Sequence, residues 1–331
     1  MKKLINYISL ILFLLIISLD QKIIAQGNLK SLETELNRIG ELSGGTLGLG
    51  VIHIETGQRV YINNSQRYPM ASTYKVPIAV QLLKRVENGE IKLEDMITVN
   101  QYDLHPGSGS ISELLINPGV ILSIRNLLEL MMLISDNSAT DMMLKAAGGA
   151  KNVNRTLRKN NIKGMQINRS TVELISDWVG VDLEEETEFS NQKFLEIYKS
   201  KTKEELEKAK KDFSKDFKDT STPKAMAVLL EKIWKKDILS DENSELLIDI
   251  MSRCKTGENR LKGFLPEGTY VAHKTGTIGS TTNDVGIIKL PNDKGHVIVV
   301  AFIKDSEIEI PEREKAIAHA ARAVHDYFLF N

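Results

Sequence analysis

Strand-like patterns at both ends of the chain, with helical patterns between them, place the strongest constraint on the fold. Near the N-terminus, residues 46–55 and 58–62 are rich in strand-forming side chains around a Thr-Gly turn, which predicts a β-hairpin. Near the C-terminus, residues 269–273, 284–290 and 296–304 predict three further strands. These strands can share one sheet only if the two ends of the chain meet.

The stretch between these two groups of strands has helical periodicity. Residues 72–147 are mainly helical in pattern, and residues 28–42 and 312–330 predict one more helix near each terminus. We therefore predict the α+β fold class: an antiparallel sheet of about five strands, flanked by helices, with an all-helical domain inserted. The predicted boundaries are 26–71 and 255–331 for the α/β domain and 72–254 for the all-helical domain.

The first 25 residues have the order of an export signal. Two lysines precede an apolar run over residues 4–19, and a small residue, Ala25, precedes the predicted cleavage point. The run is shorter than the roughly 20 apolar residues that a spanning helix needs. Cleavage after Ala25 is therefore favoured over a retained anchor, and we expect an exported protein, periplasmic or secreted, without a stable membrane span.

Composition excludes several functions. The formal net charge is −1, from 43 basic and 44 acidic residues, which gives no electrostatic basis for binding nucleic acid. The single cysteine, Cys254, excludes an internal disulfide, and we expect a buried thiol. The six histidines form neither an H-E-x-x-H motif nor an i, i+4 pair, so we predict no metal and no cofactor. Nothing in the sequence demands more than a monomer.

A candidate nucleophile, Ser72, stands where a helix is predicted to begin. Lys75 lies three residues later on the same face of that helix, and an apolar run follows it. A desolvated lysine amine can take the proton of a serine hydroxyl. The motif alone would equally describe a helix cap followed by a surface lysine. Four further S-x-x-K matches begin at Ser190, Ser200, Ser221 and Ser252.

Two other motifs add context. An S-D-N motif at residues 135–137 interrupts an apolar helical stretch, and either a loop aimed into a site or a plain interhelical turn explains it. A K-T-G motif at residues 274–276 follows a predicted strand, whose edge can present backbone donors and acceptors to an extended substrate. A second K-T-G, at residues 255–257, directly follows a predicted helix, and we interpret it as a helix stop.

In this order, S-x-x-K, S-D-N and a strand-borne K-T-G resemble the motif set of class A serine β-lactamases and penicillin-binding proteins. The segments 65–83, 133–144 and 260–277 also look like class A segments. The resemblance covers essentially the whole mature chain and is poorest over residues 164–218. It implies a β-lactamase/transpeptidase-like fold and a serine acyl-enzyme mechanism.

The resemblance also implies a role for each residue of the first two motifs. Ser72 would attack the lactam carbonyl and become the acyl ester. Lys75 would activate Ser72 or relay its proton. Ser135 would pass a proton to the leaving nitrogen, and Asn137 would bind the substrate side-chain amide and hold Lys75.

The K-T-G strand is expected to bind substrate. By the same resemblance, Lys274 and Thr275 would bind the substrate carboxylate, with Gly276 and Thr277 completing the substrate-binding strand. The backbone N–H groups of Ser72 and Thr277 would form the oxyanion hole, because donors at a helix start and on a strand are already aimed.

One part of the class A pattern is missing. Class A enzymes place a glutamate after S-D-N, in an E-x-x-L-N pattern, to activate the water that hydrolyses the acyl ester. No E-x-x-L-N occurs after S-D-N in this sequence, and the match at residues 33–37 lies before Ser72. The nearest candidate for this catalytic role is Glu173, with Asp177 where the asparagine would fall, and the acidic residues 184–188 compete with it.

The first hypothesis is an exported class A β-lactamase that hydrolyses small-molecule β-lactams through an acyl-enzyme at Ser72 and gives antibiotic resistance. The alternatives are a penicillin-binding-type DD-peptidase or transpeptidase, and a β-lactam sensor that stays acylated. All three share Ser72, and the rate of deacylation separates them.

Overall fold

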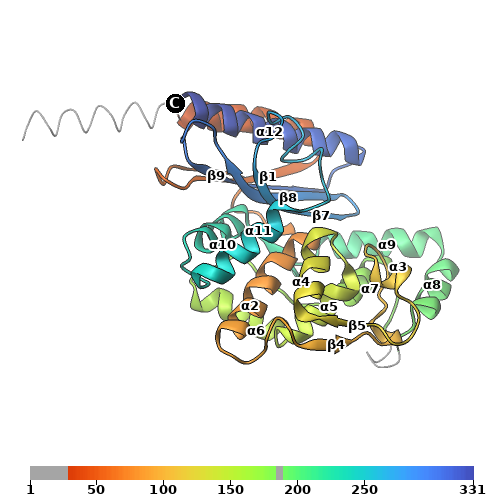
Figure 1. Cartoon of the computed structure of the whole chain (residues 1–331). Helices are drawn as coiled ribbons and strands as arrows, with labels where there is room; N and C mark the ends of the chain where they lie inside the picture. The colour runs from red at the N-terminus through yellow and green to blue at the C-terminus, as the bar shows by residue number, and fades with distance from the viewer. Residues whose placement is uncertain (1–28, 184–188) are drawn as a thin grey trace, which may run out of the picture.

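The computed structural model describes residues 29–183 and 189–331. The predicted signal peptide and the acidic residues 184–188 lie outside the described residues. The centre of the fold is a five-stranded antiparallel sheet with the strand order β2-β1-β9-β8-β7 (Figure 1). Its strands are β1 (Thr46–His53), β2 (Arg59–Ile62), β7 (Val271–Ile278), β8 (Thr281–Lys289) and β9 (His296–Lys304).

The two ends of the chain meet in this sheet, as the sequence predicted. β1 pairs with β9 along its whole length, from Thr46 opposite Lys304 to His53 opposite Val297. This pairing joins the N-terminal hairpin to the C-terminal strands, which confirms the α+β fold class with five antiparallel strands.

Helices cover both faces of the sheet (Figure 1). On one face, residues 29–40 and α12 (Ile310–Phe330) bury apolar side chains against the strands. On the other face lie α10 (Pro223–Trp234) and α11 (Asp241–Ser252). β1 approaches α10 so closely that a Cβ on Gly50 would lie 2.7 Å from the Pro223 carbonyl oxygen, and only glycine fits there.

The middle of the chain is mainly helical, as predicted. Its longer helices are α2 (Lys75–Glu87), α4 (Ile124–Leu133), α5 (Asn137–Ala146), α6 (Gly149–Lys159), α7 (Thr171–Val179), α8 (Asn191–Ser200) and α9 (Lys203–Ser214). Two small antiparallel pairs accompany them: β3 (Tyr68–Pro69) with β6 (Thr220–Ser221), and β4 (Met96–Thr98) with β5 (Ile121–Ser123).

The Cys254 thiol is buried, as expected. The predicted strand 269–273 is longer than expected: β7 continues to Ile278 because it pairs with β8 up to Thr281, so the second half of the K-T-G region lies inside the strand. Over residues 29–183 and 189–331, no helix has the length and apolar character needed to cross a membrane.

Candidate active site

Ser72 lies in a short 3-10 turn, η2 (Ala71–Tyr74), directly before α2. The Thr73 hydroxyl donates to the Met70 carbonyl at 2.8 Å and closes this turn. Ala71 has a φ of +46°, an uncommon left-handed conformation for a residue with a side chain. Ser72 is partly exposed and lines a cavity of about 490 Å³.

The junction between α4 and α5 brings the S-D-N motif to this turn. Ser135 connects the two helices with a φ of +63°, and Asn137 is the first residue of α5. The fully buried Lys75 amine donates to the Ser135 carbonyl at 2.6 Å, to Ser135 Oγ at 3.0 Å and to Asn137 Oδ1 at 3.1 Å. Of the two explanations for this motif, the structure therefore favours a loop aimed into a site.

The sheet supplies a second buried amine. Lys274 on β7 is fully buried, and its amine donates to Ser135 Oγ at 3.1 Å and to the Thr275 carbonyl at 3.0 Å. The Ser135 hydroxyl therefore lies between the amines of Lys75 and Lys274. Three motifs that are far apart in sequence meet around one hydroxyl group.

Both buried amines have lowered pKa values. Burial lowers the pKa of Lys75 well below its usual 10.5, and the nearby charge of Lys274 lowers it further. Burial also lowers the pKa of Lys274 from 10.5 to about 8. Because two adjacent buried charges of the same sign repel, the arrangement favours one neutral amine, which is a base, beside one ammonium group.

β7 runs directly against the Ser72 turn. A Cβ on Gly276 would lie 2.7 Å from the Met70 carbonyl oxygen and 2.9 Å from the Ser72 nitrogen, so this close approach requires glycine. Asn283 on β8 holds the same turn, since its side-chain amide donates to the carbonyls of Pro69 and Met70 at 2.9 Å each. The backbone N–H of Ser72 therefore lies beside the end of β7.

Sequence reasoning missed two residues that hold the K-T-G strand. The Thr256 hydroxyl lies 2.6 Å from the Thr275 hydroxyl, so the second K-T-G packs against the first. Its interpretation as a helix stop is corrected: α11 ends before it, and the motif supports β7. Arg260 donates to Thr277 Oγ1 at 2.7 Å. The second K-T-G tripeptide could have drawn attention to Thr256. No motif in the sequence predicts the contact between Arg260 and the K-T-G strand.

The structure does not bring Glu173 to Ser72. Its carboxylate accepts from the Ser170 N–H at 2.7 Å and from the Ser170 hydroxyl at 2.9 Å, as part of a capping box at the start of α7. Glu173 is exposed and lines a separate cavity of about 590 Å³ beside His105. Glu173 is not among the residues that line the Ser72 cavity. The α7 residues that line the Ser72 cavity are Thr171, Leu174, Ile175 and Trp178.

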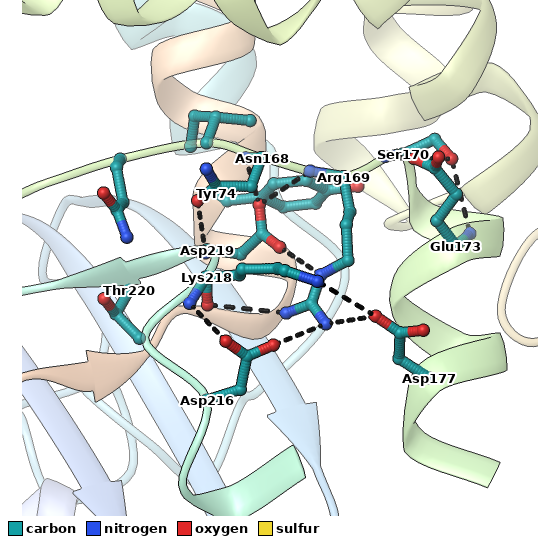
Figure 2. Close-up of polar contacts among 12 residues, drawn as sticks. Tyr74, Asn168, Arg169, Ser170, Glu173, Asp177, Asp216, Lys218, Asp219 and Thr220 are labelled. Carbon is teal, nitrogen blue, oxygen red and sulfur yellow. Dashed lines mark hydrogen bonds and ion pairs between the residues drawn. The ribbon is translucent and has the colours of Figure 1, made fainter. Parts of the chain in front are cut away.

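A charged cluster fixes the segment that leads into α7 (Figure 2). The buried Arg169 guanidinium lies 2.6 Å from Asp177, 3.0 Å from Asp216 and 2.6 Å from Asp219. The Asp219 carbonyl accepts from the Met70 N–H at 3.0 Å, two residues before the serine. Asp177, considered above as the counterpart of the class A asparagine, therefore belongs to a cluster that joins the α7 segment to the Ser72 turn.

Comparisons with known proteins agree with this geometry. The sequence model described as "Beta-lactamase enzyme family" matches residues 31–328. Beta-lactamase VEB-1 of Pseudomonas aeruginosa is 29% identical over 90% of this chain and 91% of its own length. Extended-spectrum beta-lactamase PER-1 of the same organism is 26% identical over 86% of this chain and 83% of its own.

Solved structures give the same result. The TLA-1 extended-spectrum beta-lactamase superposes with a TM-score of 0.74 at 28% identity, covering 91% of this chain and 99% of the other. An ancestral class A beta-lactamase superposes with a TM-score of 0.73 at 28% identity, over 89% and 99% of the two chains. The chain therefore belongs to the beta-lactamase enzyme family and is a serine β-lactamase of class A.

Proposed function

We propose that this enzyme opens β-lactams through an acyl-enzyme on Ser72. The Ser72 oxygen attacks the lactam carbonyl, and the neutral amine of Lys75 takes the hydroxyl proton. The lactam C–N bond then breaks, and Ser135 passes its proton to the leaving nitrogen while it takes one from the Lys75 ammonium 3.0 Å away. A new carbonyl–oxygen ester bond holds the product on Ser72, and Lys75 is neutral again. The observation that carries this proposal is the Ser135 hydroxyl, which lies 3.0 Å from the Lys75 amine and 3.1 Å from the Lys274 amine.

Substrate binding is assigned to the strand and to α5. The N–H groups of Ser72 and Thr277 stabilise the oxyanion that forms in the transition state. Lys274 attracts the substrate carboxylate through its charge, Thr275 binds it directly, and Asn137 binds the side-chain amide. The Asn137 side chain is already held, since its amide donates to the Pro106 carbonyl at 2.9 Å.

The alternatives differ from this function in how long the ester survives. A DD-peptidase or an acylated sensor would keep the β-lactam on Ser72, whereas a β-lactamase releases it. Measuring turnover of a chromogenic cephalosporin together with the intact protein mass separates them. Repeated turnover supports hydrolysis, and a stable adduct without turnover would contradict it. We also propose export, with cleavage after Ala25, and action as a monomer in antibiotic resistance.

We expect the plot of kcat/KM against pH to have a rising limb and a falling limb. Lys75 must be neutral to act as a base, so kcat/KM is expected to rise with pH as its ammonium form disappears. Lys274 must be charged to attract a carboxylate, and its pKa is about 8, so kcat/KM is expected to fall above about pH 8. A profile of kcat/KM from pH 5 to pH 10 measures both limbs. A flat profile above pH 8 would remove Lys274 from carboxylate binding.

The Glu173→Gln variant is expected to keep its turnover within about twofold of wild type, because the carboxylate lies outside the Ser72 cavity. Weakening its contacts with Ser170 should cost no more than about 0.5–1 kcal/mol of stability. Steady-state turnover and thermal unfolding of the variant check both statements. Loss of turnover with retained acylation would return Glu173 to the water step.

A further inference from the structure

One wall of the Ser72 cavity carries a pair of hydroxyl groups. The Tyr74 hydroxyl lies 2.5 Å from Thr171 Oγ1, and both side chains line the cavity while being almost fully buried. Tyr74 precedes Lys75 in the chain, and Thr171 is the first residue of α7. The other α7 residues on this wall, Leu174, Ile175 and Trp178, carry no hydroxyl or carboxyl group. Thr171, in contact with Tyr74, is therefore the α7 residue that brings a hydroxyl group to the cavity.

Acidic side chains near this wall are engaged elsewhere. In the part of the chain that the structure describes, no aspartate or glutamate lines the Ser72 cavity. Glu173 faces Ser170 on the other side of α7. The Asp141 carboxylate accepts from the N–H of Thr171 at 2.5 Å and of Val172 at 3.0 Å, and it lies 2.7 Å from His105.

These contacts make the hydroxyl pair a prepared binding point. Burial, and next the charge of Asp141, raises the pKa of Tyr74 well above its usual 10, so the phenol stays neutral. A neutral hydroxyl offers one donor and two acceptor positions. The bond between Tyr74 and Thr171 uses one donor, which leaves one donor and further lone pairs for a third partner. Asp141 fixes the Thr171 backbone, and the start of α2 fixes Tyr74.

We propose that the hydroxyls of Tyr74 and Thr171 bind and orient the water that hydrolyses the Ser72 ester, without a carboxylate in the cavity. The inference rests on the proposed acyl-enzyme. The water oxygen attacks the ester carbonyl and gives a proton to the neutral Lys75 amine. The bond between the carbonyl carbon and the Ser72 oxygen then breaks, Lys75 returns the proton to that oxygen, and the released acid ionises into solvent.

This arrangement predicts a slow second step. Neutral hydroxyls orient a water but do not take its proton at neutral pH, and the one base, Lys75, must serve both halves of the reaction. Deacylation is therefore expected to limit the rate. A chromogenic cephalosporin should give a burst of one product per enzyme, followed by slower turnover.

Rapid-mixing kinetics and quenched-flow mass spectrometry of the Ser72 adduct test the proposal. Tyr74→Phe and Thr171→Val should acylate at the wild-type rate and deacylate about tenfold more slowly. The double variant should be hardly slower than either single variant, because the two hydroxyls act as one unit. Tyr61→Phe, on β2, and Thr98→Val, on β4, are matched controls that should deacylate at the wild-type rate.

A gain-of-function variant separates chemistry from folding. Thr171→Glu would place a carboxylate in the cavity, where it can act as a general base, and should speed deacylation by about tenfold or more. Deacylation in this variant should also become dependent on the titration of a carboxylate, which a purely structural change would not produce. Wild-type deacylation rates in Tyr74→Phe and Thr171→Val, with a normal adduct, would overturn the inference. A wild-type enzyme that forms no adduct would instead overturn the proposed acyl-enzyme, and this inference with it.

Discussion

The Ser72→Ala variant is expected to lose β-lactam turnover by a factor on the order of 10⁵ to 10⁶ and to form no covalent adduct. The substitution removes the oxygen that forms the ester, while the buried amines and the oxyanion donors remain. Ser135 keeps a hydroxyl between Lys75 and Lys274, but it is only 7% exposed and is not among the residues that line the Ser72 cavity. We therefore do not expect Ser135 to replace Ser72.

The measurement combines hydrolysis of a chromogenic cephalosporin with the intact mass of the protein after incubation. Ser252→Ala is a matched control, because Ser252 begins another S-x-x-K match and its hydroxyl donates to the Asp249 carbonyl within α11. The control should acylate and turn over normally. If the Ser72→Ala protein gains the same mass as the wild type, the ester must be on another residue. That result would remove Ser72 as the nucleophile.

Local patterns were sufficient for most of the fold. The hairpin of β1 and β2 and the interruption between α4 and α5 follow from periodicity and turn chemistry, which act over a few residues. The end of β7 does not, because its last residues are strand only through pairing with β8. A propensity pattern carries no information about such a partner, so the strand appeared too short.

Glu173 shows how a family motif and a helix-capping motif can point to the same residue. The spacing placed an acid after S-D-N, but Ser170-x-x-Glu173 is also the pattern of a capping box, and the structure contains that box. Capping turns the carboxylate back toward Ser170. The sequence contained this signal, and weighing it against the loose family pattern would have favoured a helix start.

Other site residues could not be inferred from spacing. Tyr74 and Thr171 are 97 positions apart, and Thr256 and Thr275 are 19 apart, yet each pair of hydroxyls is in contact. Through-space pairing of this kind is decided by how the helices and the sheet pack. The three ordered motifs were predictable because the functional residues of each motif lie within a stretch of three or four residues.

The Arg169→Ala variant is expected to lose about 3 kcal/mol of unfolding free energy, because it leaves Asp219 buried without its cation. This loss should lower the Tm by roughly 5 °C for a chain of this size. Arg169 is 5% exposed and Asp219 is 2% exposed, so solvent cannot replace the contact. Thermal unfolding of the mature enzyme measures the effect, with Arg169→Lys as the conservative variant of intermediate stability.

An exposed ion pair supplies the matched control for this prediction. Arg38 pairs with Glu35 at 2.7 Å on an exposed helix face, and such pairs contribute little. Arg38→Ala should therefore leave the Tm almost unchanged. Equal losses in Arg169→Ala and Arg38→Ala would show that the cluster around Asp219 has no special weight in the stability of the fold.

The pH dependence of the loss identifies its cause. Burial raises the pKa of Asp219 in the folded protein, and Arg169 opposes that rise. Without Arg169 the pKa of Asp219 in the folded protein should rise further above its unfolded value. The variant therefore loses stability in full at pH values above the folded pKa, and it regains stability as the pH falls through the folded pKa toward the unfolded value. The difference in Tm between wild type and Arg169→Ala should therefore narrow in acid. A difference that stays constant would assign the loss to packing of the arginine side chain, for example over Phe213 at 5.2 Å, instead of to the unpaired carboxylate.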